Sequence, residues 1–285
     1  MTEQMVTVEA SDGLSLSGFE VTGRRRGAGI VWIHGFGVGF DLPECIELGR
    51  ELARREIGFV AGNVRGHDGG AAGFRRRGGG YDVIPIGSWW EVFEESAMDV
   101  AAWVEHARHV GFERIVLAGH SFGALKAVYY VSSTHPEEVA GLALVSPSFG
   151  LLFVDPTVAE RANSLVSAGR GHELLPAGSW SRGFGTDTVS AQTYASWWRV
   201  APTFFGEGAT RFADITCPML VVYGATGDLG GQDEIDRFRR LAASTPRFES
   251  AVVTGLRHRY AGGEKLLADA IERWVAVGAG HLAKE

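Results

Sequence analysis

This sequence has few cysteines, no excess of basic residues and no long apolar run. The two cysteines, Cys45 and Cys217, lie far apart with no motif around them, so two free, mostly buried thiols are favoured over one disulfide. The formal net charge of −7 argues against a nucleic-acid binder held by phosphate contacts. No stretch reaches the roughly 18 consecutive apolar residues of a membrane helix. The N-terminus has no basic segment followed by an apolar one, so we expect no signal peptide and a cytoplasmic protein.

Two further absences concern ligands. The basic runs Arg24–Arg26 and Arg75–Arg77 are short and stand beside glycines. We interpret them as solvated loops, with a role toward an anionic substrate or a membrane surface as the alternative. His67 and Asp68 adjoin each other, but no other metal ligand follows at a recognisable spacing. We therefore expect neither a metal nor a cofactor.

Short apolar runs alternate with segments of helical spacing along most of the chain. An N-terminal hairpin is predicted over 5–23, and a long glycine-rich loop over 66–82. Buried strands are predicted at 29–35, 57–66, 113–119, 139–147, 217–228 and 248–255. Helices are predicted at 42–56, 89–111, 121–134, 231–245 and 263–278. The alternation is typical of a mostly parallel, doubly wound sheet covered on both faces, which is an α/β fold.

One segment interrupts this alternation. Between 149 and 214 we find no clear strand and helix order, apart from a helix predicted at 190–201. So long a connection between two sheet strands is too long for an ordinary loop. We therefore predict a core formed by 1–148 and 215–285, with a mostly helical lid inserted at 149–214.

The pentapeptide "GHSFG" at 119–123 stands where a predicted strand passes into a predicted helix. The pattern Gly-x-Ser-x-Gly is weak by itself, because 40 glycines in the chain make a chance match common. Its position is more informative. Two glycines permit a sharp turn, which pushes the Ser121 hydroxyl clear of the sheet, beside the N–H groups that start the next helix. We therefore predict that Ser121 is a nucleophile.

These features resemble the α/β-hydrolase superfamily, and the resemblance runs from about Gly29 to Val277. The segment "WIHGFG" ends the first buried strand and is similar to the His-Gly loop of that superfamily, which supplies half of the oxyanion hole. The resemblance implies that the backbone N–H groups of Phe36 and Phe122 are the two donors. His34, in the same loop, is interpreted as a packed structural histidine.

A nucleophilic serine needs a base and an orienting acid, and the superfamily order is Ser, then Asp or Glu, then His. Among nine histidines, His258 fits the base because it follows the last predicted strand, in a loop before the last helix. Asp228 fits the acid, four residues past Gly224, although relatives often have one residue fewer there. Asp233, expected in the first turn of a helix, and Asp155, early in the lid, are the alternatives.

Two segments bear on substrate recognition. "NVRGHDGG" resembles the Arg-Gly-x-Gly turn of many relatives, with Asp68 in place of the second glycine. We interpret Arg65 there as a structural buttress rather than a substrate ligand. The lid is rich in aromatic residues, and Trp180 and Trp197 are our candidates for lining an apolar pocket. Packing of the lid on the core is the alternative reading of these side chains.

The resemblance implies a serine hydrolase that cleaves a carboxylic ester of a small to medium, largely apolar molecule, without a cofactor. Ser121, His258 and Asp228 are its predicted triad. Hydrolysis of a C–C bond in a β-diketone-type compound, of a lactone or of a thioester would use the same triad. A non-catalytic receptor on this fold is a third hypothesis. The expected partner is a small-molecule substrate, with no nucleic acid and no membrane span, and a homodimer is one option for assembly.

Overall fold

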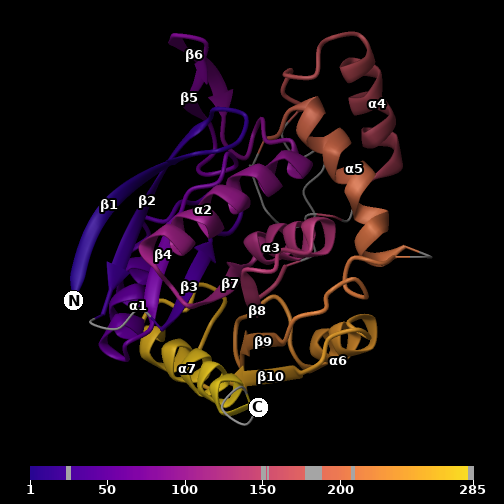
Figure 1. The fold of residues 1–285 in the computed structure, drawn as a ribbon. Coiled ribbons are helices and arrows are strands. Elements are labelled where there is room, and N and C mark those ends of the chain that lie inside the picture. Colours follow the sequence, from indigo (N-terminus) through magenta and orange to yellow (C-terminus); the bar gives the residue numbers. More distant parts are fainter. Residues whose placement is uncertain (24–26, 149–151, 153, 177–187, 207–208, 282–285) are drawn as a thin grey trace.

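The computed structural model describes residues 1–23, 27–148, 152, 154–176, 188–206 and 209–281. Its centre is a sheet of eight strands in the order β1-β2-β4-β3-β7-β8-β9-β10 (Figure 1). The strands are β1 (Thr2–Glu9), β2 (Ser15–Thr22), β3 (Ala28–Ile33), β4 (Gly58–Gly62), β7 (Arg114–His120), β8 (Val139–Val145), β9 (Met219–Gly224) and β10 (Phe248–Val253). β1, β2 and β4 pair antiparallel, and the pairs from β4 to β10 are parallel. The predicted N-terminal hairpin and mostly parallel sheet are confirmed.

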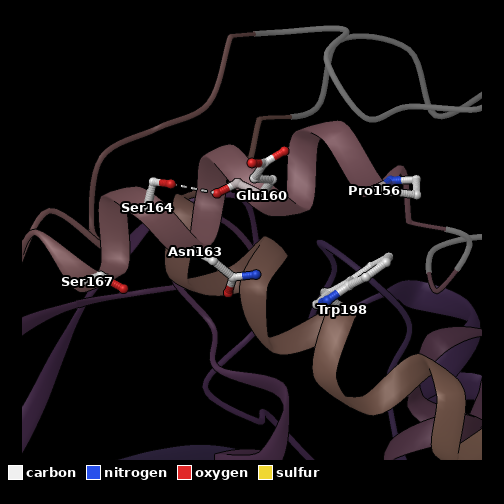
Figure 2. A pocket seen from close by; sticks show the side chains of 6 residues that line it. All are labelled: Pro156, Glu160, Asn163, Ser164, Ser167 and Trp198. Carbon is white, nitrogen blue, oxygen red and sulfur yellow. Dashed lines mark hydrogen bonds between the residues drawn. The ribbon is translucent and has the colours of Figure 1, made fainter.

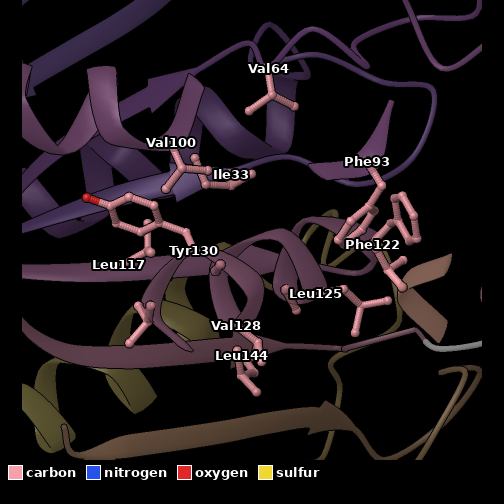
Figure 3. Close-up of a cluster of buried hydrophobic side chains, with 14 of the residues drawn as sticks. Ile33, Val64, Phe93, Val100, Leu117, Phe122, Leu125, Val128, Tyr130 and Leu144 are labelled. Carbon is pink, nitrogen blue, oxygen red and sulfur yellow. The ribbon is translucent and has the colours of Figure 1, made fainter. Parts of the chain in front are cut away.

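Each face of the sheet buries its own apolar cluster, and β3 shows how the sequence divides them. Val31 and Ile33 belong to one cluster, whereas Ile30 and Trp32 belong to the other, because successive side chains of a strand point to opposite faces. The first cluster packs under α2, α3 and α6, and part of it is drawn in Figure 3. The second packs under α1 and α7. The bounds of these helices are Pro43–Arg54 (α1), Ser96–Val110 (α2), Phe122–Thr134 (α3), Gln232–Leu241 (α6) and Glu264–His281 (α7).

Among the described residues, two α-helices come between β8 and β9, within the segment predicted as a lid. They are α4 (Pro156–Ser167) and α5 (Ala191–Phe205), and they pack against each other. Figure 1 shows both helices beyond one end of the sheet, with α5 on the side of α3 and α4 on the outer side of α5. The helix predicted at 190–201 corresponds to α5. Its role as part of a lid stays a prediction.

The prediction of a loop over 66–82 is wrong in part. The structure has β5 (Ala71–Arg77) and β6 (Gly80–Ile86), which pair antiparallel and leave only residues 78–79 as the turn. A two-residue turn that uses glycine at positive φ suits the twist of a hairpin, and Gly78 has φ 56°. The hairpin projects beyond the main sheet (Figure 1).

The second basic run lies on this hairpin and not in a solvated loop. Arg75 forms an ion pair with Asp12 at 2.9 Å, and Arg76 forms one with Glu9 at 2.6 Å. These contacts attach β5 to the N-terminal hairpin. The first basic run, 24–26, lies outside the described residues.

The helix predicted over 89–111 begins later than expected. α2 starts at Ser96, after a 3-10 turn over Phe93–Glu95, and residues 89–92 are not helical. The carbonyl groups of Trp89 and Trp90 accept hydrogen bonds from α5 and the residue before it, which competes with a helix at this point. The predicted end of the helix is correct, because Gly111 ends α2 in the left-handed conformation, with φ 92°.

Both cysteines are free thiols, as predicted, and Cys45 is buried. Burial raises the pKa of the Cys217 thiol to about 11, so this thiol stays protonated at neutral pH. Across the part of the chain that the structure describes, no helix is long and apolar enough to cross a membrane.

Candidate active site

Ser121 occupies a sharp turn between β7 and α3. Its backbone has φ 54° and ψ −120°, a strained conformation that non-glycine residues adopt rarely and usually at functional sites. The two flanking glycines leave no room for a side chain. A Cβ on Gly119 would lie 2.4 Å from the carbonyl oxygen of Gly123, and a Cβ on Gly123 would lie 2.3 Å from that of His34. The sequence therefore forces the turn that was expected from "GHSFG".

Three side chains from different parts of the chain form one line of hydrogen bonds. His258 Nε2 lies 3.1 Å from the Ser121 hydroxyl, and His258 Nδ1 lies 3.0 Å from Asp228 Oδ1. A carboxylate can only accept, so Nδ1 carries the proton and Nε2 faces the serine as an acceptor. The three residues stand at the carboxyl ends of β7, β9 and β10, which meet at one edge of a parallel sheet. The structure thus brings together all three residues predicted as the triad.

Asp228 is held in place by four donors. Besides His258, it accepts from the Ser146 hydroxyl at 2.6 Å, from the Gly224 N–H at 2.6 Å and from the Leu229 N–H at 2.7 Å. Burial by itself would raise the pKa of Asp228, but these hydrogen bonds outweigh burial and lower it below its ordinary value. The carboxylate is therefore ionised at neutral pH, beside the imidazole that it orients.

Ser146 is a contact that the sequence reasoning missed. It directly follows β8, has φ 47° and is fully buried. The available signal was its position after an apolar strand, at the same edge of the sheet as Ser121 and Asp228. A serine after a strand is too common to be selected by that signal alone.

The two alternative acids lie at the starts of helices. Asp233 lies in the first turn of α6, as expected. Asp155 caps α4, where its carboxylate accepts from the N–H groups of Thr157 and Val158 at 2.8 and 3.2 Å. Helix N-termini favour a carboxylate in both places, so the structure gives each aspartate a local role away from His258.

His34 connects the loop after β3 to the end of β4. Its Nδ1 donates to the Gly35 carbonyl at 2.8 Å, and its Nε2 accepts from the Val64 N–H at 3.1 Å. Burial, followed by the positive charge of Lys126, lowers the pKa of His34 to about 3. His34 is therefore a neutral histidine that joins two backbone segments, in agreement with the structural interpretation.

Phe122 follows Ser121 in the sequence, and Phe36 packs against Phe122. Their rings meet edge to face, with centroids 5.9 Å apart. Phe122 is the first residue of α3, where a backbone N–H has no acceptor within the helix. The role of the two backbone N–H groups as an oxyanion hole stays a prediction.

Trp197 of α5 packs against both of these phenylalanines. Its ring centroid lies 5.8 Å from that of Phe36 and 5.9 Å from that of Phe122, and the side chain is fully buried. Trp197 therefore contacts the residues that flank Ser121, rather than solvent. Trp180, the other candidate for lining a pocket, lies outside the described residues.

Trp198, the next residue of α5, points the other way. It is 37% exposed and borders an open hollow of about 470 Å³ between α4 and α5 (Figure 2). The other lining residues all belong to α4, and they are Pro156, Glu160, Asn163, Ser164 and Ser167. This hollow is not lined by Ser121, His258 or Asp228. The two adjacent tryptophans therefore face different places, Trp197 toward Phe36 and Phe122 and Trp198 toward the hollow.

α5 is fastened to the segment that precedes α2. The hydrogen bonds that join them include those from Ser190 N and Thr193 Oγ1 to Trp89 O, from Gln192 Nε2 to Trp90 O, and from Phe93 N to Ser196 Oγ. The donors and acceptors are buried or partly buried, so breaking this set would leave polar groups unsatisfied. α5 is thereby fixed beside Ser121 through both its backbone contacts and Trp197.

Arg65 is surrounded by carboxylates and is only 3% exposed. It pairs with Asp99 at 2.8 Å, Glu95 at 2.6 Å and Asp12 at 3.2 Å. These contacts join the end of β4 to the start of α2 and to the turn after β1. This is the geometry of the structural buttress that we expected.

His67 and Asp68 contact each other at 2.8 Å, but they do not form part of a larger ligand cluster. Within residues 1–23, 27–148, 152, 154–176, 188–206 and 209–281, no group of three or more His, Cys, Asp or Glu side chains could hold a metal ion.

Comparison with known proteins identifies the family of this chain. Residues 30–283 match the model of the alpha/beta hydrolase family, and the chain belongs to that family. A search among curated proteins gave no match.

Solved structures share the fold at low sequence identity. The alpha/beta hydrolase GrgF from Penicillium sp. sh18 is similar with a TM-score of 0.72 and 15% identity, over 99% of this chain and 100% of GrgF. Est1E from Butyrivibrio proteoclasticus, solved with ferulic acid bound, has a TM-score of 0.66 and 16% identity, over 96% and 100% of the two chains. The Pyrococcus furiosus esterase Pf2001 has a TM-score of 0.58 and 16% identity, over 95% and 92%.

Proposed function

We propose that this protein is a serine hydrolase that cleaves a carboxylic ester of a small to medium, largely apolar substrate. The observation that carries the proposal is the line of hydrogen bonds from Ser121 through His258 to Asp228, at a strained turn between a strand and a helix. A serine is a poor nucleophile unless a base removes its proton, and the base must be held in one tautomer. The three side chains meet both requirements.

In the proposed reaction, the Ser121 oxygen attacks the ester carbonyl while His258 Nε2 takes the hydroxyl proton. Asp228 stabilises the imidazolium that forms. The backbone N–H groups of Phe36 and Phe122 bind the negative oxygen of the tetrahedral intermediate. His258 then gives its proton to the leaving alcohol, and a water molecule activated by His258 releases the acid from Ser121.

The composition of the site supports an apolar acyl or aryl group. Phe36, Phe122 and Trp197 gather next to the nucleophile, and ligand sites are mostly apolar and aromatic. α4 and α5, in the segment 149–214, are proposed to serve as the lid over this site. Est1E and the esterase Pf2001, which share the fold, support ester hydrolysis as the class of reaction.

The nucleophile is tested by labelling with a fluorophosphonate probe. Wild-type protein should be labelled, and Ser121→Ala should not. His258→Ala should lower kcat for a model ester by several orders of magnitude, and near-normal turnover in that variant would assign the base to another residue. Absence of labelling in the wild type would refute the proposal.

The bond type is tested with a panel of p-nitrophenyl esters of increasing acyl length, together with lactones, thioesters and β-diketones. We expect the highest kcat/KM for an ester with an apolar acyl group. A clear preference for any of the other three classes would replace the ester in the proposal while leaving the triad unchanged.

A further inference from the structure

His120, the residue before the proposed nucleophile, reaches the backbone of the proposed base. Its Nε2 lies 2.7 Å from the carbonyl oxygen of His258. A carbonyl oxygen only accepts, so Nε2 carries the proton and donates it. His120 is 7% exposed, and a buried hydrogen bond of this kind would leave an unsatisfied acceptor if its donor were lost.

The His120 ring is held by aromatic neighbours on two sides. Trp32 of β3 stacks on it, with centroids 6.2 Å apart and 9° between the planes. Tyr260, two residues after His258, meets it edge to face at 5.1 Å and 83°. The ring therefore has one orientation, and that orientation directs Nε2 at His258.

The opposite edge of the ring adjoins the loop after β3. A Cβ built on Gly35 would lie 3.4 Å from His120 Nδ1 and 3.2 Å from the Ser121 Cβ. The glycine thus allows close approach of this loop to both residues. His120 consequently touches the loop that carries Phe36 on one side and the loop that carries His258 on the other.

The loop around His258 depends on this contact. The His258 N–H donates to the Gly227 carbonyl over 3.5 Å, a long distance, whereas the bond from His120 to the His258 carbonyl is 2.7 Å. The shorter bond is the stronger restraint on the His258 backbone. The imidazole of His258 must lie within hydrogen-bond reach of Ser121, and a displacement of about 1 Å can cost roughly 100-fold in rate.

We propose that His120 is a positioning residue, which fixes the main chain of His258 and so sets the distance from the imidazole to the Ser121 hydroxyl. This inference rests on the proposed function, because it assigns His258 the part of the base. His120 does not itself accept the proton from Ser121. Its imidazole is a neutral donor with a fixed tautomer.

The test compares variants that keep or lose the donor. His120→Gln retains an N–H that can reach the His258 carbonyl, whereas His120→Phe keeps a ring between Trp32 and Tyr260 but cannot donate. We expect His120→Phe to lower kcat by about 100-fold with KM changed by less than about 3-fold. His120→Gln should recover kcat to within about 10-fold of the wild type. His106, which bonds to Glu20 instead, provides the matched control, and His106→Phe should leave kcat within about 2-fold.

His120→Asn supplies a second measurement if His120→Phe does not fold. The asparagine amide is too short to reach the His258 carbonyl, so this variant should behave like the phenylalanine variant. Equal kcat for the Gln, Asn and Phe variants, or a change confined to KM, would overturn the inference.

A readout that needs no substrate separates this inference from the proposed function. The proton that His258 Nδ1 shares with Asp228 should give a low-field NMR signal, retained in His120→Gln and lost or shifted in His120→Phe and His120→Asn. An unchanged signal in all variants would refute the positioning role, even if esters are hydrolysed. The opposite outcome is also distinguishable. If the wild type shows the signal and His120→Phe and His120→Asn lose it, but the wild type is not labelled by fluorophosphonate, the hydrolase proposal is refuted and the positioning role is retained.

Discussion

Acid should destabilise this protein through His34, because the side chain is buried and uses its unprotonated nitrogen. Nε2 accepts from the Val64 N–H at 3.1 Å, so a proton on Nε2 would face another donor. Burial and the nearby Lys126 lower the pKa of His34 to about 3 in the folded protein. In the unfolded chain the pKa returns to about 6.5.

The direction and size of the effect follow from these two pKa values. The folded pKa is the lower one, so between pH 6.5 and about 3 the unfolded chain binds more protons. The stabilising contribution is therefore complete above pH 6.5 and falls as the pH falls through this window. At pH 5 the loss from His34 is about 2 kcal/mol, and at pH 4 about 3 kcal/mol.

Urea unfolding at pH 7 and pH 5 measures this loss. His34→Gln keeps an acceptor for the Val64 N–H but does not titrate, so its free energy of unfolding should fall by about 2 kcal/mol less than that of the wild type between the two pH values. Carboxylates contribute to both proteins and cancel in the comparison. Val64→Ala, destabilised without loss of a titrating group, should follow the wild-type pH dependence. Parallel curves for wild type and His34→Gln would refute the reasoning.

Three further substitutions probe the site and its support. Trp197→Ala removes a buried ring from Phe36 and Phe122, and should cost about 3–5 kcal/mol in urea unfolding together with a lower kcat in an ester assay. Asp228→Asn leaves His258 without its carboxylate, and steady-state kinetics should show kcat reduced by about 10⁴-fold. Both carboxylate oxygens accept from backbone N–H groups, so the asparagine NH2 leaves one of these donors unpaired and the free energy of unfolding should fall by about 1–3 kcal/mol. Gly123→Ala places a Cβ 2.3 Å from the His34 carbonyl oxygen, and should lower the thermal midpoint severely or abolish folding.

Each of these substitutions has a matched control in the chain. Trp198→Ala alters the exposed neighbour of Trp197 and should change stability by less than about 1 kcal/mol. Asp155→Ala removes a helix cap, at a cost of about 1 kcal/mol, and should not change kcat. Gly80→Ala adds a Cβ where no atom lies within 4 Å, so it should melt like the wild type. If a control variant lost as much stability or activity as the variant it is paired with, the contact assigned to that paired residue would be contradicted.

The meeting of Ser121, His258 and Asp228 could be predicted because each residue is tied to a regular element. Ser121 sits between an apolar strand and a helix, and His258 follows the last strand, so chain order and the shared edge of a parallel sheet bring them together. Asp228 was found in the same way, despite one extra residue after Gly224. Local periodicity and topology carry this information, and both are readable from one sequence.

Contacts between distant segments could not be predicted in this way. The hairpin at 71–86 overlaps a glycine-rich stretch whose composition favours a loop. The segment 89–95 has the composition of a helix, but hydrogen bonds to α5 and a 3-10 turn replace its first turns. Ser146 and His120 acquire their roles only from partners that lie many residues away. No local pattern encodes such pairings.

The attachment of α5 to residues 89–93 has a consequence for recombination between relatives. Trp89 and Phe93 bond to α5 and the residue before it, although they precede that helix by about one hundred residues. The unit that can be exchanged between homologues is therefore discontinuous. A chimera that receives only α4 and α5 from a relative will have mismatched donors and acceptors where α5 meets residues 89–93. A chimera that receives residues 89–93 as well keeps these hydrogen bonds.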